Sequence, residues 1–341
     1  MRRLIAVVLI FAALWFGYWF VARAALERGV ADAFRNARAE GRVARYQSLG
    51  VTGFPNRFDM TLDEVALGLP LAALEGEPAG GAALAEAIWH APQVQLIALS
   101  YRPNRMIAVL PGAQMLTLPD QKITLISKQL AANFNLAADT ALSFDSLALI
   151  GDGVKITSTA GWAATLKQGR LAANRLQAPA TYRLGFEALD LAPNPALRAR
   201  IDPNGDLPAV IGKLHLDGQL TLSAPLDRHA GETRPEPQAI TLSDARLDWG
   251  QTRITATGTL HRGAGGLAEG QLDVKITHWQ PLLNIAEADG AIDPASVPTW
   301  RKALQALAQG SGQADTVDLP LVFAGGQISF GFLPLGPAPH F

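Results

Sequence analysis

The chain contains six histidines, but none is paired at a spacing that would hold a metal. Two histidines four residues apart on a helix, as in the HExxH pattern, converge on one zinc ion. No such pair occurs. The chain also lacks cysteine, which excludes thiol catalysis, thiolate metal sites and a disulfide framework. We therefore expect neither a metal site nor a cofactor at the scattered histidines, which are His90, His215, His229, His261, His278 and His340.

Two short strings imitate ligand-binding motifs without meeting their chemistry. Residues 202–206, DPNGD, begin like a calcium loop, but Leu207 and Lys213 stand where glycine and glutamate are needed. A proline-containing turn is the preferred interpretation. Residues 263–268 fit the string of a dinucleotide-binding loop, yet they join two predicted strands instead of opening a helix. No GxSxG or SxxK nucleophile motif occurs. We therefore expect a protein without catalytic activity, and an exported hydrolase is the less favoured alternative.

The first 25 residues instead predict a membrane anchor. From Leu4 to Ala22 there is no charge and no proline, and as a helix this apolar run would be about 28 Å long, close to the ~30 Å hydrocarbon core of a bilayer. Arg2 and Arg3 precede it and predict a cytoplasmic start. We expect residues 1–22 to be a single-pass signal anchor in a bacterial inner membrane, with the bulk of the chain in the periplasm.

A cleaved signal peptide is the alternative, since Ala22 and Ala24 flank Arg23 in a small-x-small pattern. The apolar run exceeds the usual 7–15 residues of such a peptide, and Trp15 and Trp19 lie near its outer end, where aromatic residues anchor spanning helices. A buried helix of a soluble core is a further alternative, but such a helix would carry a polar face, and the run from Leu4 to Ala22 has no charged residue.

The composition is apolar and nearly neutral. Of 341 residues, 49% are hydrophobic and only 17% are charged, and the formal net charge is −1. Soluble domains typically carry about 25% charged residues. The net charge near zero gives no electrostatic reason to expect nucleic-acid binding. The high hydrophobic and low charged fractions predict an extensive apolar interior or an apolar binding surface.

Residues 23–45 predict an amphipathic helix, with Leu26, Val30 and Phe34 on one face and charged residues on the others. We expect this stripe to pack on a sheet; a helix lying on the membrane surface is the alternative. Residues 46–341 then predict one β-rich domain. Its expected features include a hairpin turn at 102–104, a loop at 75–83, a tight turn at 152–153 and helix within 281–310.

The clearest strand is residues 213–224, in which leucines alternate with polar residues over twelve positions. Residues 251–261 and 270–277 alternate in the same way. One apolar and one wet face are typical of an antiparallel sheet. We therefore predict a mainly β (α+β) fold, with a long-stranded, curved antiparallel sheet and helices packed on it. The apolar positions, which are candidate lipid contacts, are Leu214, Leu216, Leu220, Leu222, Ile254, Leu272, Val274 and Ile276.

Several strings together support a family resemblance: GFPNRFD at 53–59, SYRPNR at 100–105 and LPL at 319–321 with the glycine- and proline-rich end that follows. With the single span in front, the chain resembles the alphaproteobacterial family called "domain of unknown function 2125" over nearly its whole length. That resemblance implies no activity and no site residues. Residues 247–250, LDWG, and the strands after them are similar to AsmA-type envelope proteins, which pair an inner-membrane helix with a long curved sheet and are implicated in lipid handling.

These observations predict two functions. A continuous leucine-rich face must be covered by helices, a second sheet or a ligand, so the first is a groove that binds or passes membrane lipid. The second is a non-catalytic scaffold of envelope assembly that binds other envelope proteins through a sheet edge.

Overall fold

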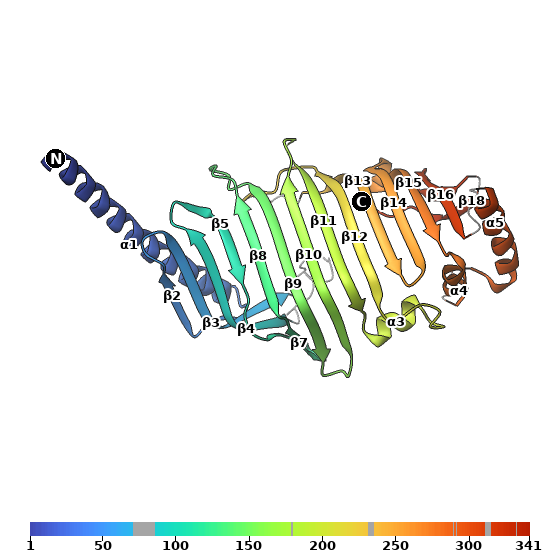
Figure 1. The fold of residues 1–341 in the computed structure, drawn as a ribbon, viewed down its shortest axis with the longest axis horizontal. Coiled ribbons are helices and arrows are strands. Elements are labelled where there is room, and N and C mark those ends of the chain that lie inside the picture. Colours follow the sequence, from blue (N-terminus) through green and yellow to red (C-terminus); the bar gives the residue numbers. More distant parts are fainter. Residues whose placement is uncertain are drawn as a thin grey trace. The chain divides into compact units, whose positions relative to one another are not determined.

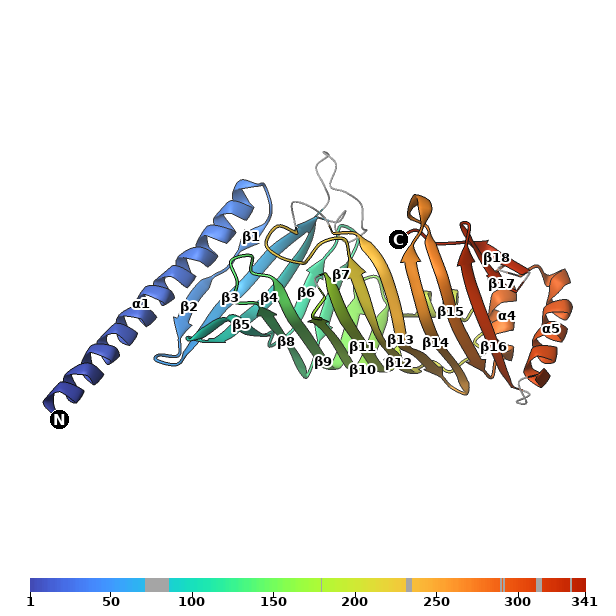
Figure 2. The ribbon, with the colours of Figure 1, turned by 90° about the horizontal axis from the view of Figure 1, so that it is seen from above.

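The computed structural model describes residues 1–70, 86–178, 180–230, 235–288, 290, 292–310, 315–331 and 333–341. The predicted loop at 75–83 lies outside these residues. The chain divides into two units: the first comprises Met1–Asn135 and Ile156–Gly161, and the second Leu136–Lys155 and Trp162–Phe341. Each unit is built on antiparallel strands (Figures 1 and 2).

The apolar start of the chain forms one continuous helix, α1 (Arg2–Ala39), which is long and apolar enough to cross a membrane. The predicted span and the predicted amphipathic helix are therefore parts of one rod. The helix ends close to Gly41, whose φ of +81° suits glycine. It does not reach residue 45, because Ala44–Arg45 already form the short strand β1.

The first unit is a set of antiparallel strands covered by the second half of α1. Leu26, Val30 and Phe34 pack against a buried cluster that includes Val51 and Met60, which confirms that the apolar stripe covers a sheet. The strands are β1, β2 (Ser48–Thr52), β3 (Arg57–Pro70), β4 (Glu86–Leu99), β5 (Arg102–Val109), β6 (Gln114–Thr117), β7 (Lys122–Ile126) and β8 (Gln129–Leu136).

The turn between β4 and β5 falls earlier than predicted. It consists of Ser100 and Tyr101, because Leu99 already pairs with Arg102. Pro103 and Asn104 therefore belong to β5, and the prediction of a turn at 102–104 is wrong.

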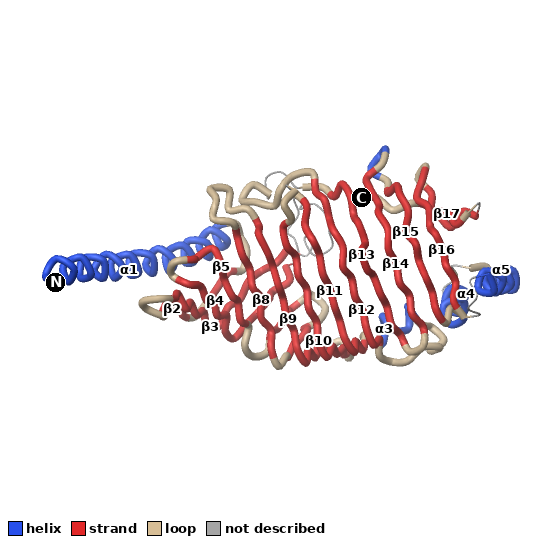
Figure 3. The backbone as a smooth tube through the Cα atoms, turned by 45° about the horizontal axis from the view of Figure 1, so that its top comes forward, coloured by secondary structure: helices blue, strands red, loops and turns tan. Residues whose placement is uncertain are grey.

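The second unit is a long meander in which each strand from β10 to β18 pairs antiparallel with the next. Figure 3 shows these strands running side by side. They are β9 (Phe144–Ser158, whose last residues belong to the first unit), β10 (Ala163–Arg175), β11 (Thr181–Ala192), β12 (Ile211–Leu222), β13 (Pro237–Trp249), β14 (Thr252–Arg262), β15 (Ala268–Thr277), β16 (Thr316–Ala324), β17 (Gln327–Phe330) and β18 (Leu333–Pro337).

The predicted turn at 152–153 is also wrong, since β9 runs straight through it. Gly153 has a φ of +58° inside the strand, the conformation that glycine supplies at a β-bulge. The dipeptide that predicted the end of a strand is therefore an irregularity within one.

Helices occupy one end of the second unit's strands (Figure 1). They are α3 (Pro195–Ile201), α4 (Gln280–Ala288) and α5 (Val297–Gly310), with the 3-10 turn η2 (Pro294–Ser296) before α5. A second 3-10 turn, η1 (Ala264–Gly266), joins β14 to β15 at the opposite end of the strands. The prediction of helix within 281–310 is confirmed as α4 and α5. Asn194 caps α3 by accepting a hydrogen bond from the Leu197 amide at 2.8 Å. The predicted fold class, a large antiparallel sheet with an apolar N-terminal helix, is confirmed.

Candidate functional site

The strands of the second unit gather their apolar side chains on one side, here called the apolar face of β10–β16. Residues that pair directly across antiparallel strands point to the same side of a sheet. Leu216 pairs with Phe186 of β11 and Ala245 of β13, and the row continues through Ala256 to Val274. This row crosses the middle of the strands.

A second row lies nearer the helical end of the strands. Leu214 pairs with Leu247, and the row passes through Ile254 and Ile276 to Val317 of β16. Both rows consist only of aliphatic and aromatic side chains, so neighbouring strands extend one another's apolar surface.

The remaining predicted positions complete the same face. Leu220 pairs with Tyr182, and Leu222 packs in the same buried cluster as these two residues. Leu272 pairs with Leu321. The structure therefore brings all eight predicted residues to one side of the second unit, as the alternation in the sequence indicates.

Close backbone approaches in this sheet require glycine. Gly258 has a φ of +143°, and a Cβ there would lie 2.2 Å from the backbone oxygen of Gln271. Gly270 has a φ of +137°, and a Cβ there would lie 2.2 Å from the backbone oxygen of Thr259. Both sites exclude any side chain, as expected where a sheet is sharply bent.

The helices cover only the adjacent end of the apolar face. Leu282 and Ile285 of α4 pack with Trp249, Leu214 and Leu247. Ala308 of α5 and Leu283 of α4 form the neighbouring cluster with Ile276 and Leu319. At the opposite end, Tyr182 and Leu222 are buried with Leu226.

The middle of the face is open. Leu171 of β10 and Phe186 of β11 are paired neighbours and are 39% and 40% exposed. Leu216, Ala256 and Val274 on the same row are half-buried. Between two closed ends lies a strip of apolar side chains that water reaches, the arrangement expected of a surface that holds an apolar ligand.

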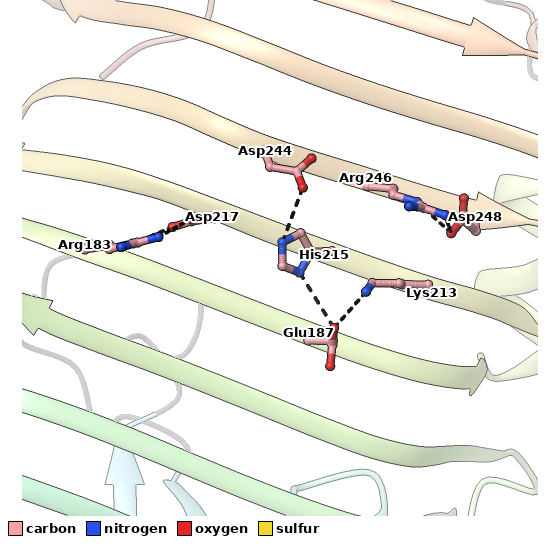
Figure 4. Close-up of polar contacts among 8 residues, drawn as sticks. All are labelled: Arg183, Glu187, Lys213, His215, Asp217, Asp244, Arg246 and Asp248. Carbon is pink, nitrogen blue, oxygen red and sulfur yellow. Dashed lines mark hydrogen bonds and ion pairs between the residues drawn. The ribbon is translucent and has the colours of Figure 1, made fainter.

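The opposite face of the same strands carries paired charges (Figure 4). Arg183 donates two hydrogen bonds to Asp217, at 2.9 and 2.6 Å. These bonds hold the Asp217 pKa below its usual value. Lys213 contacts Glu187 at 2.9 Å, and this hydrogen bond lowers the pKa of Glu187.

The remaining charges of Figure 4 are also paired. The ring of His215 lies between Glu187 and Asp244, with nitrogen to oxygen distances of 3.8 and 3.6 Å. Burial would raise the pKa of Asp248, but hydrogen bonds from Arg246 and Arg253 outweigh it and the pKa lies below its usual value. Charges that neutralise one another across strands stabilise a wet sheet surface, and they do not provide an activated nucleophile.

A shallow cavity of about 520 Å³ also lies over β14–β16. Its lining includes Thr255, Lys275 and Asp318, which pair in register on the charged face. Lys275 and Asp318 form an ion pair at 3.3 Å. The lining also includes Ala256 and Val274 of the middle apolar row, so the cavity is mixed in character.

The motif look-alikes are structural. The Asp202 carboxylate accepts hydrogen bonds from the amides of Asp206 and Leu207 at 2.8 and 3.1 Å and contacts Arg198 at 3.5 Å. It therefore closes a turn. Residues 263–268 connect β14 to β15 through η1. Within the described residues no group of histidine, aspartate and glutamate is arranged to hold a metal ion.

Sequence reasoning missed two features, the cross-strand ion pairs and the attachment of residues 15–20 of α1 to the first unit. The pair Arg183–Asp217 joins residues 34 positions apart, and only strand register could have placed them together. The aromatic residues Trp15, Tyr18 and Trp19 make this attachment. From the sequence they were interpreted only as residues at the membrane interface.

Comparison with known proteins gives one family. The family model described as "Uncharacterized protein conserved in bacteria (DUF2125)" matches residues 19–339, which confirms the resemblance drawn from the sequence. No curated protein and no solved structure matches the chain.

Proposed function

The chain belongs to the DUF2125 family of uncharacterized bacterial proteins, and we propose that it is a membrane-anchored, non-enzymatic envelope protein that holds lipid acyl chains along the apolar face of β10–β16. In this proposal α1 crosses the inner membrane and both units lie in the periplasm. Its partner is membrane lipid, with no cofactor and no nucleic acid.

The open middle row carries the proposal. Burying an apolar side chain is worth about 25 cal/mol for each Å² removed from water, so exposed neighbours such as Leu171 and Phe186 favour an apolar occupant. An acyl chain suits the site because the row is narrow, runs across several strands and consists of apolar side chains.

Photocrosslinking in membranes tests this function in the full chain. A benzophenone amino acid replaces Phe186, and the matched control replaces Gln219, an exposed residue of the charged face. Leu9 of α1 serves as the control for anchoring. We expect a phospholipid adduct at positions 186 and 9, and none at 219. An adduct at 9 but none at 186 would overturn the lipid site while leaving the anchor intact.

The scaffold alternative requires a strand edge that accepts a partner strand. Edge strand β18 has proline at two of its five positions, Pro334 and Pro337, and proline offers no amide hydrogen for pairing. This strand is therefore poorly suited to β-strand addition. A protein adduct at position 186 in place of lipid would favour the scaffold.

A further inference from the structure

The last part of the apolar run in α1 is fixed to two turns of the first unit by side-chain hydrogen bonds from Trp15 and Tyr18. The Trp15 indole nitrogen donates to the oxygen of Pro55 at 3.1 Å. The Tyr18 hydroxyl donates to the oxygen of Ser100 at 2.7 Å. One turn thus lies between β2 and β3, and the other between β4 and β5.

Packing reinforces the attachment. The ring of Phe54, at the tip of the first turn, lies 5.3 Å from Phe16, 5.4 Å from Trp19 and 6.0 Å from Phe20. Trp19 is only 2% exposed. The turns are therefore held at a definite height along the helix, beside residues 15–20.

That height lies within the apolar run Leu4–Ala22. Residues 1–14 are all exposed, and the free helix from Arg2 to Leu14 is about 20 Å long. This length is short of a ~30 Å hydrocarbon core. If Leu4 marks the cytoplasmic boundary of the hydrocarbon core, Trp19 lies about 22 Å from that boundary. Tilting the helix shortens this distance and keeps Trp19 further from the opposite boundary. The helix therefore spans a bilayer only if the two turns enter the far leaflet.

We propose that the tips of these turns, with Phe54, Leu99 and Tyr101, insert into the acyl-chain region of the membrane leaflet that faces the folded units. The inference rests on the proposed anchoring by α1. The three side chains are 47%, 39% and 58% exposed, so large apolar surface is displayed at the height where lipid is expected.

Backbone oxygens of the first turn accept hydrogen bonds from side chains of the protein. Non-helical backbone at membrane depth must have its polar groups satisfied by the protein. The Pro55 oxygen accepts from Trp15 and from the Ser100 hydroxyl, the latter at 3.0 Å. The Arg57 oxygen accepts from the Trp19 indole at 2.9 Å.

Two further hydrogen bonds join backbone groups at these turns. The Arg57 amide donates to Gly53 and the Ser100 amide to Asn56, both at 2.9 Å. Ser100 itself is fully buried. Arg57 and Arg102 directly follow the two turns and are exposed. Arg57 pairs with Asp59 at 2.8 Å. An arginine in the position of Arg102 extends to lipid phosphates while its stem crosses apolar surface.

Because the chain has no cysteine, single spin labels report depth without background. Full-length protein is reconstituted in vesicles of phosphatidylethanolamine and phosphatidylglycerol, with labels at Phe54→Cys or Tyr101→Cys. Leu9→Cys is the control for the anchor. Lys128→Cys is the control for water, since this exposed residue precedes β8, whose pairing with β5 puts it at the far end of the strands.

We expect oxygen accessibility to exceed that of a water-soluble nickel complex several-fold at positions 9, 54 and 101, with the reverse at 128. Lipid exposure at 9 combined with water exposure at 54 and 101 would overturn the insertion and leave the anchor standing. Water exposure at 9 would overturn both. Tyr101 makes the second test independent, because a label there leaves the ring contacts of Phe54 in place.

Discussion

The indole nitrogen of Trp19 donates a hydrogen bond to the backbone oxygen of Arg57 at 2.9 Å, and the two residues lie 38 positions apart. This contact joins an apolar helix to the first strand pair of the first unit. The ring of Trp19 also stacks on Phe58 at 5.7 Å. A residue in the apolar run thus belongs to the core of a folded unit.

Replacing Trp19 with alanine should therefore destabilise the first unit. Loss of a buried tryptophan typically costs about 3–5 kcal/mol, and the Arg57 oxygen loses its donor. Denaturant unfolding of the detergent-solubilised full chain would measure the change in free energy. Phe11→Ala is the control, because Phe11 is 67% exposed on the same helix and its loss should leave the unfolding midpoint unchanged. Equal effects of the two substitutions would contradict the attachment.

Gly258→Ala should destabilise the second unit, since the added Cβ would lie 2.2 Å from the oxygen of Gln271 and the φ of +143° disfavours any side chain. We expect a loss of about 1–3 kcal/mol or more. Gly185→Ala is the matched control, because its Cβ would meet only the Ala172 methyl at 3.9 Å. Thermal unfolding followed by circular dichroism separates the two variants, and similar melting temperatures would disprove the close approach.

Side-chain alternation predicted the apolar face because it depends only on neighbouring residues. Strand β12 shows this: its leucines occupy every second position, and register with β11 and β13 then follows from the same period. The eight predicted positions came together for that reason.

Features that depend on distant residues were not predictable in this way. Gly153 follows Asp152 in a dipeptide typical of turns, and only pairing with other strands keeps β9 continuous. Likewise the sequence around Trp19 shows an apolar helix but not the backbone oxygen of Arg57 that receives its hydrogen bond. The open middle row also depends on where α4 and α5 end, which their own sequences do not reveal.

The ion pairs of the charged face predict a dependence of stability on acid. Hydrogen bonds from Arg183 hold the Asp217 pKa in the folded chain below the ordinary value of 3.8. A carboxyl group with a lowered pKa contributes its full stabilisation above that ordinary value and loses it as the pH falls through the folded value. Asp217→Asn should therefore lower the melting temperature at pH 7, and the difference from the unmodified chain should vanish in acid.

The same comparison with Asp244→Asn provides the control. Asp244 is 55% exposed and contacts His215 at 3.6 Å, so its loss should have less effect at pH 7. A difference for Asp217→Asn that persists unchanged below pH 3 would show that the pair with Arg183 is not its cause.

The loop that resembles a calcium site should respond to loss of its carboxylate and not to calcium. Asp202 is 2% exposed, and it accepts amide hydrogen bonds from Asp206 and Leu207. Asp202→Ala leaves both amides without this acceptor. Only the Leu207 amide is buried, and a buried unsatisfied donor costs about 1–3 kcal/mol. Asp206→Ala removes an exposed neighbouring carboxylate and should be nearly neutral. If calcium at millimolar concentration raised the melting temperature of the unmodified chain, and Asp206→Ala abolished that rise, the loop would be a cation site and the turn-closing role of Asp202 would be secondary.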